Sequence, residues 1–206
     1  MARKRKVPSR KRRGLKWLSI LAVLLLVNGI LNLYPLFPGQ VLAAEESRYG
    51  IWDAETVRAI WDGGQRLYLR RSASQFSFSA VGFHPLSGWS SSIPPLGIPL
   101  DSEHPWGAWV RTSDDEARIV LFGFLPEEEE PPVLSIRAGE DSSNLAGSTG
   151  ETEIDQFTPQ ADIPGEGGSY CLTVLRYSIP QGGYVRLYIQ EPGAWARLEY
   201  YCLSPG

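Results

Sequence analysis

The sequence predicts an all-β protein: an antiparallel β-sandwich of the jelly-roll or Ig-like kind, preceded by an N-terminal signal or transmembrane helix. Three observations carry this prediction. Glycine and proline, 21 and 16 residues, recur throughout the 206-residue chain. Long helical periodicity is absent after residue 62, and about ten short segments are separated by turn residues. An acidic connector between the two halves leaves open an alternative of two small β modules.

Residues 1–43 form a separate leader. All the lysines, and nine of the 20 cationic residues, lie within residues 1–16. The apolar stretch 17–27 follows, and then the small residues of Val41-Leu42-Ala43-Ala44. This order of basic, apolar and small residues is typical of an export signal. We therefore expect the basic block to set the orientation of the leader rather than to bind nucleic acid.

The fate of the leader has two interpretations. Its apolar stretch is shorter than the about 20 residues of a spanning helix, which favours cleavage between Ala43 and Ala44 and then secretion. The interval between the stretch and that site is long for a cleaved signal, so an uncleaved membrane anchor through residues 17–37 is the alternative. Both interpretations place residues 44–206 outside the cytoplasm.

Residues 44–206 are strongly acidic. They hold eleven arginines and all 23 acidic residues, which gives a net charge of −12. Phosphate backbones and anionic lipid headgroups repel such a surface, so no nucleic-acid partner is expected. Two cysteines remain, Cys171 and Cys202. In an exported chain this even number predicts a disulfide, closing a loop of about 30 residues.

The first β region is expected over residues 44–126. Residues 54–61 fit either a short helix or a turn that leads into a strand. Alternating apolar and small or polar residues predict strands over residues 66–70, 76–83, 107–112 and 117–125. Phe76 and Phe78 are expected to share one strand face. A loop rich in Pro, Gly and Ser is expected over residues 84–105, and its length indicates a short strand or a functional surface.

Residues 127–132, four glutamates followed by two prolines, form a stiff, self-repelling connector. The second β region, which holds the predicted disulfide, covers residues 133–206. Strands are predicted over residues 133–137, 151–155, 169–177, 184–190 and 195–203. Tyr184, Arg186 and Tyr188 are expected on one face, where pairing with the last strand makes a mixed aromatic–arginine ladder.

One strand carries closely spaced acids. On a strand, Glu151, Glu153 and Asp155 line one face about 7 Å apart. Because like charges repel, a calcium ion, which takes several oxygen ligands, is one way to offset them. A solvated outer face is the other. No further cofactor is expected.

Catalytic motifs are absent from the sequence. It has no Gly-x-Ser-x-Gly elbow, and its two histidines, His84 and His104, precede prolines and lack the spacing of a zinc motif. A small secreted hydrolase remains an alternative, which would require one histidine beside a serine or a paired acid.

Aromatic residues are the remaining functional signal. Six tryptophans follow residue 43, and most are expected in the core. Trp89 and Trp106 differ, because they lie in or beside the expected loop among glycine, serine and proline. We therefore expect a non-catalytic, extracytoplasmic module that binds carbohydrate or the cell envelope through Trp89 and Trp106. The alternative is a structural or adhesion subunit anchored by its N-terminal helix.

Overall fold

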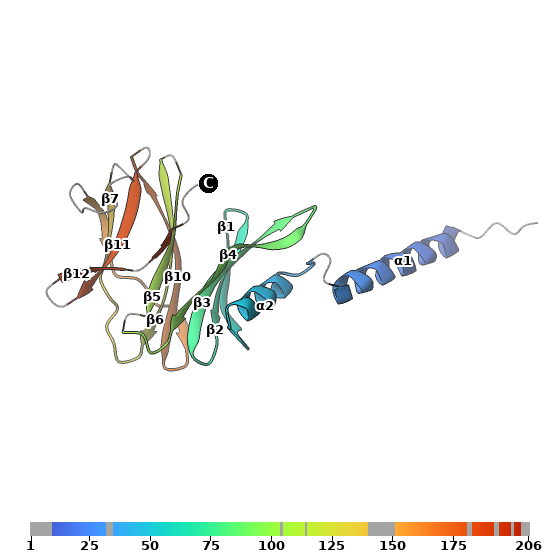
Figure 1. Ribbon diagram of the computed structural model, residues 1–206, viewed down its shortest axis with the longest axis horizontal. Coiled ribbons are helices and arrows are strands. Elements are labelled where there is room, and N and C mark those ends of the chain that lie inside the picture. The colour runs from blue at the N-terminus through green and yellow to red at the C-terminus, as the bar shows by residue number, and fades with distance from the viewer. Residues whose placement is uncertain are drawn as a thin grey trace, which may run out of the picture.

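The computed structural model describes residues 10–31, 35–103, 105–113, 115–139, 151–180, 183–191, 194–198 and 200–202. In this part of the chain two helices, α1 (Arg10–Leu31) and α2 (Pro38–Arg48), precede thirteen strands (Figure 1). The predicted all-β character of the body is therefore confirmed. Among the described residues, no helix combines the length and the apolar character needed to cross a membrane.

The strands form three sheets. In spatial order, the first sheet contains β1 (Glu55–Asp62), β2 (Gln65–Arg71), β3 (Gln75–His84) and β4 (Gly88–Pro99). The middle sheet contains β13 (Tyr200–Cys202), β5 (Trp106–Thr112), β6 (Glu116–Pro126), β10 (Gly168–Ser178) and β9 (Ile163–Gly165). The third sheet contains β12 (Ala194–Arg197), β11 (Tyr184–Glu191), β7 (Leu134–Gly139) and β8 (Thr152–Phe157). Neighbouring strands are antiparallel except β13 and β5, which run parallel.

The three sheets are stacked in layers, and the middle sheet is buried on both faces (Figure 1). Phe76 and Phe78 share the face of β3 that packs on Phe122 of β6, as predicted. The neighbouring residue Leu121 points the other way and packs with Leu187 of β11. A strand covered on both faces is apolar at every position, which explains the run of apolar residues in β6. The expected two-layer packing is therefore extended by a third layer.

Strands from both halves of the chain pair directly. Strand β10, which follows the acidic connector, pairs with β6, which precedes it, from Gly168 opposite Pro126 to Ser178 opposite Glu116. The segment 127–132 therefore connects the middle sheet to the third sheet. The two halves build one stack of sheets that share a layer.

Polar contacts tie the layers together at their edges. Asp62, at the end of β1, forms ion pairs with Arg118 of β6 and Arg176 of β10. The hydroxyl of Tyr177 in β10 donates a hydrogen bond of 2.6 Å to Asp155 of β8. The first contact joins the first and middle sheets, and the second joins the middle and third sheets.

Helix α2 covers part of the outer face of the first sheet (Figure 1). It begins at Pro38, a residue suited to the first turn of a helix. Its Leu42 is only 2% exposed and packs on Tyr68 and Val81. The backbone N–H of Trp89 also donates to the carbonyl of Pro35, at 3.1 Å. The chain on both sides of the helix start is therefore held against the sheet.

A buried ion pair holds the second half of the same helix. Glu46 lies 2.5 Å from Arg70 of β2, and both side chains are largely buried. Burial raises the pKa of Glu46, and the charge of Arg70 opposes that rise. The expected cleavage position, between Ala43 and Ala44, lies between these two contacts, in the middle of a packed helix.

The structure decides between the open alternatives for two segments of the first sheet. Residues 54–61 lie mostly in strand β1 and form no helix. The expected loop 84–105 contains the twelve-residue strand β4. Proline lacks a backbone donor, and β4 tolerates its prolines because it lies at the edge of the sheet, with β3 as its one neighbour in the described sheet.

The predicted disulfide between Cys171 and Cys202 is wrong. The expected strand 195–203 is divided, and its second part, β13, joins the far edge of the middle sheet. Two strands then separate β13 from β10, so the two cysteine backbones lie at least about 14 Å apart, whereas a disulfide requires less than about 7 Å. Cys171 is a buried free thiol, and burial raises its pKa.

Candidate functional site

The three carboxylates of the predicted calcium site have separate partners. Each accepts a hydrogen bond from a different hydroxyl: Glu151 from Tyr188 (2.8 Å), Glu153 from Ser135 (2.7 Å) and Asp155 from Tyr177 (2.6 Å). Glu151 is also buried against Arg186, at 2.5 Å. Within the described ranges no three histidine, cysteine or acidic side chains are grouped as metal ligands. Each of the three carboxylates therefore has its own protein donor, and the predicted calcium site stays a prediction.

Aromatic–arginine contacts are present on the third sheet, but they differ from the predicted ladder, because one of the arginines comes from β7 and the last strand, β13, joins the middle sheet. The guanidinium of Arg186 lies 4.8 Å from the ring centre of Tyr184. That of Arg137 lies 4.6 Å from Tyr188 and 5.8 Å from Trp195. Such contacts stabilise adjacent strands, so they account for these residues without a ligand.

Trp106, one of the two predicted binding residues, is buried. It is 6% exposed and belongs to the core between the middle and third sheets. Its ring lies directly on Gly123 of β6, where even a Cβ would come within 2.3 Å of the ring. Glycine at this position therefore makes the space that the indole fills, and Trp106 offers no ring to a surface ligand.

Trp89, the other predicted residue, belongs to an exposed aromatic cluster. Its ring centre lies 5.9 Å from Trp61 and 5.5 Å from Phe83, and the planes are tilted by 44° and 59°. Trp61 is 61% exposed and Phe83 is 52% exposed, whereas Trp89 is half-buried between them. We call Trp61, Phe83 and Trp89 the outer aromatic surface. It lies on the face of the first sheet that α2 partly covers.

The strands fix the position of these rings. Phe83 and Trp89 are opposite each other in the β3–β4 hairpin, and Trp61 of β1 is opposite Arg66 of β2. The Arg66 guanidinium lies 6.0 Å from the ring of Trp61 and 5.3 Å from that of Tyr68. A cation beneath one side of the cluster orients the rings while leaving the outer ring surfaces exposed.

Sequence reasoning missed Trp61 and Phe83 as surface residues. The pattern around Trp61 fits either a short helix or a turn before a strand, and the pattern around Phe83 predicts the end of an ordinary strand. A signal was available: a short segment with Pro85 at its start and Gly88 at its end separates Phe83 from Trp89, and these residues favour a hairpin turn. Gly88 indeed has a positive φ of 76°, which glycine adopts without strain.

The histidines give little support to catalysis. His84 is exposed as the last residue of β3, and its Nδ1 accepts a hydrogen bond of 3.3 Å from the backbone N–H of Leu86 in the turn that follows. This contact belongs to the turn. His104 lies outside the described residues.

Comparison of the chain with protein-family models, with curated proteins and with solved structures finds no match.

Proposed function

We propose that this protein is an exported, non-catalytic β protein that binds polysaccharide or another component of the cell envelope through the outer aromatic surface. The observation that carries this proposal is the exposure of Trp61 and Phe83 beside Trp89 on a rigid sheet. Contiguous exposed apolar side chains on a folded domain mark interaction sites. A flat aromatic ring packs well on the C–H face of a pyranose, and rings held by strands lose little entropy when they bind.

Export is supported by the leader. Helix α1 carries an exposed apolar stretch (17–27) after a basic block. The length of this stretch suits the apolar region of an export signal, which needs about 7–15 residues. No described part of the β body packs on it, since its large apolar side chains are exposed on all sides of the helix.

Binding to polysaccharide is tested with matched variants of the full-length chain. Trp61→Ala and Phe83→Ala should each weaken retention on insoluble polysaccharides or on a glycan array by about tenfold, the loss of about 1.4 kcal/mol. Trp52→Ala is the control, because Trp52 is equally exposed and none of the ring contacts of the surface involves it. Retention that is absent, or that Trp52→Ala reduces equally, would refute the proposal.

A second candidate is a structural or adhesion subunit that keeps its leader. The packing of α2 favours it, because removal of residues 1–43 would take Leu42 out of its contacts with Tyr68 and Val81. It would also remove the carbonyl of Pro35 that Trp89 contacts. The intact mass of the protein from its natural source distinguishes the two candidates. A chain that starts at Ala44 indicates cleavage and release of the protein, and an uncleaved leader indicates that the protein keeps its anchor.

A further inference from the structure

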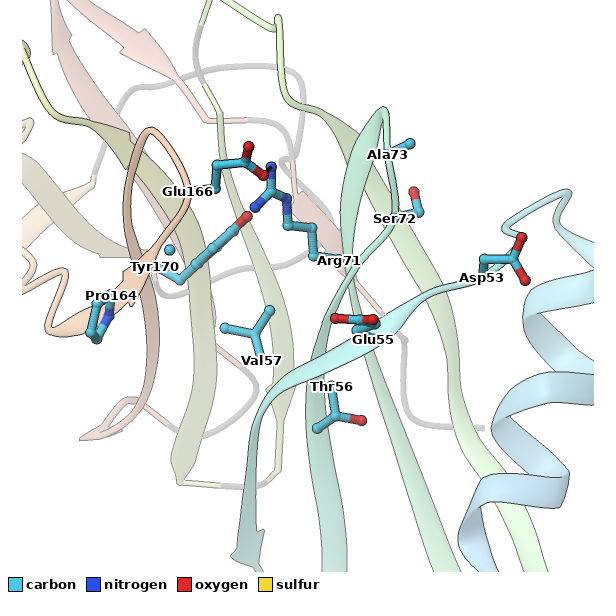
Figure 2. Close-up of a pocket in the computed structure, with 11 residues that line it drawn as sticks. Asp53, Glu55, Thr56, Val57, Arg71, Ser72, Ala73, Pro164, Glu166 and Tyr170 are labelled. Atoms are coloured by element: carbon cyan, nitrogen blue, oxygen red, sulfur yellow. Dashed lines mark hydrogen bonds and ion pairs between the residues drawn. The ribbon is translucent and has the colours of Figure 1, made fainter.

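An open hollow of about 510 Å³ lies where the first and middle sheets separate (Figure 2). One wall comes from the start of β1 and the end of β2, and the other from the hairpin of β9 and β10. Leu67 and Leu69 of β2 face the core between these sheets. Arg71 continues the same row of β2, two residues further on, and therefore points into the open end of the interlayer space. The hollow is distinct from the outer aromatic surface, which lies on the opposite face of the first sheet.

Tyr170 brings a buried polar group to this hollow. The residue is 1% exposed, and among the described residues no group hydrogen bonds with its hydroxyl. Figure 2 shows the hydroxyl end of Tyr170 directed toward Arg71 and Glu166. A buried hydroxyl that lacks a partner costs about 1–3 kcal/mol, so such groups in folded proteins call for an explanation. A ligand in the hollow would supply the partner.

The ring of Tyr170 is held firmly in place. It packs on Phe124 and Phe76, with ring centres 4.9 and 6.1 Å away. On its other side lies Gly165, where a Cβ would come within 2.3 Å of the ring. Burial raises the pKa of Tyr170, so the phenol keeps its proton and remains a donor at neutral pH. The hydroxyl is therefore preorganised for a hydrogen-bond acceptor.

Arg71 is the cation of the hollow, and its partner is weakly held. The guanidinium donates a hydrogen bond of 3.1 Å to Glu166. The side chain of Glu166 is 87% exposed, next to Gly167 in the turn between β9 and β10. Exposed ion pairs contribute little free energy. The carboxylate of Glu166 thus occupies a position that the carboxylate of a ligand can take over.

The opposite side of Arg71 is acidic. Glu55 is the cross-strand neighbour of Arg71 in the pairing of β1 and β2, and Asp53 lines the hollow beyond it. A ligand with only negative charge would be repelled by these two carboxylates. A ligand with only positive charge would leave Arg71 and the Tyr170 hydroxyl without an acceptor. A ligand that carries both charges satisfies Arg71, the Tyr170 hydroxyl and Glu55.

We infer that this hollow binds a small zwitterionic ligand, such as an amino acid or a short peptide. Its carboxylate contacts Arg71 and Tyr170, and its ammonium group contacts Glu55. The site is independent of the outer aromatic surface.

The test uses the full-length chain and a series of ω-amino acids from glycine to 6-aminohexanoate, measured by isothermal titration calorimetry at millimolar concentrations. N-acetylglycine and glycinamide, each with one charge removed, are the ligand controls. At least one member of the series should bind, and both controls should bind about tenfold more weakly. A series in which nothing binds, or in which glycinamide binds as well as the best zwitterion, overturns the inference.

Tyr170→Phe separates a ligand contact from a structural role. This variant keeps the packed ring and removes the unpartnered hydroxyl, so affinity should fall about tenfold while the melting temperature stays the same or rises. Glu55→Gln should also weaken binding, whereas Glu128→Gln, on the exposed connector, should not. Unchanged affinity in Tyr170→Phe overturns the inference. Trp61→Ala should leave this binding intact even where it abolishes retention on polysaccharide.

Discussion

The docking of α2 can be tested with one side chain. Leu42 is 2% exposed and packs on Tyr68 and Val81. Leu42→Ala removes these contacts and leaves a cavity at the helix–sheet interface. Such substitutions cost about 2–5 kcal/mol, and about 3 kcal/mol is expected for Leu42→Ala because the interface is covered by a single helix. The change lowers the stability of the docked helix more than that of the sheets, since the two cores of the stack lie elsewhere.

Native-state amide hydrogen exchange, read by mass spectrometry over α2 and the start of β4, is the appropriate assay. A loss of about 3 kcal/mol in docking free energy accelerates exchange there about 100-fold. Ser47→Ala is the control, since Ser47 is exposed on the same helix. If Leu42→Ala and Ser47→Ala change the exchange rates equally, α2 is not held by this contact, and the argument against cleavage at Ala43 fails with it.

Three further outcomes are expected. Burial and a hydrogen bond to Asp155 raise the pKa of Tyr177, so its contribution to stability is complete below pH 10 and is lost as the pH rises, by up to about 1.4 kcal/mol per pH unit. Urea unfolding at pH 10 and 11 should show that the free energy of unfolding falls less with pH in Tyr177→Phe than in the wild-type protein. An equal fall in the two proteins would contradict this. Asp62→Ala leaves Arg118 largely buried without its partner and should cost about 3 kcal/mol in the same assay; a loss below about 0.5 kcal/mol would mean that the layers do not depend on this contact. Because Cys171 is a free thiol, dithiothreitol should not change the melting temperature. A fall of several degrees would indicate that the protein contains a disulfide after all.

Most of the longer strands can be predicted from the sequence, and β1 and β4 cannot. Strands β2, β3, β5, β6, β10 and β11 follow the predicted ranges closely. The sequence of strand β1 leaves a helix and a turn before a strand as alternatives, because of one bulge. The pairing with β2 shifts between Thr56 and Arg58, so Val57 and Ile60 both reach the core although they are three residues apart. A bulge of this kind imitates helical spacing in the sequence.

Of the two tryptophans that the sequence predicts as binding residues, the structure leaves one beside exposed rings and buries the other. Trp89 was identified from its neighbours, and it does belong to the outer aromatic surface. Trp106 was identified by the same reasoning, and it is buried. Proline and glycine can flank a tryptophan in a loop, where its ring is exposed, and equally in a strand, where its ring is buried against a neighbouring strand. Only the register of β5 on β6, which places Gly123 beneath Trp106, distinguishes the two cases.

The three-layer stack explains where an aromatic-rich sequence places its rings. Strand β5 illustrates this, since Trp106 enters the core toward the third sheet while Trp109 enters the core toward the first sheet. A middle layer buried on both faces requires two cores, and large aromatic side chains fill both. On the third sheet, the outward rings of Tyr184 and Tyr188 contact the guanidinium groups of arginines. The outer face of the first sheet has α2 over only part of its surface. The packing of the stack does not require the exposed rings beside that helix, and this is the basis of the proposal that they bind a ligand.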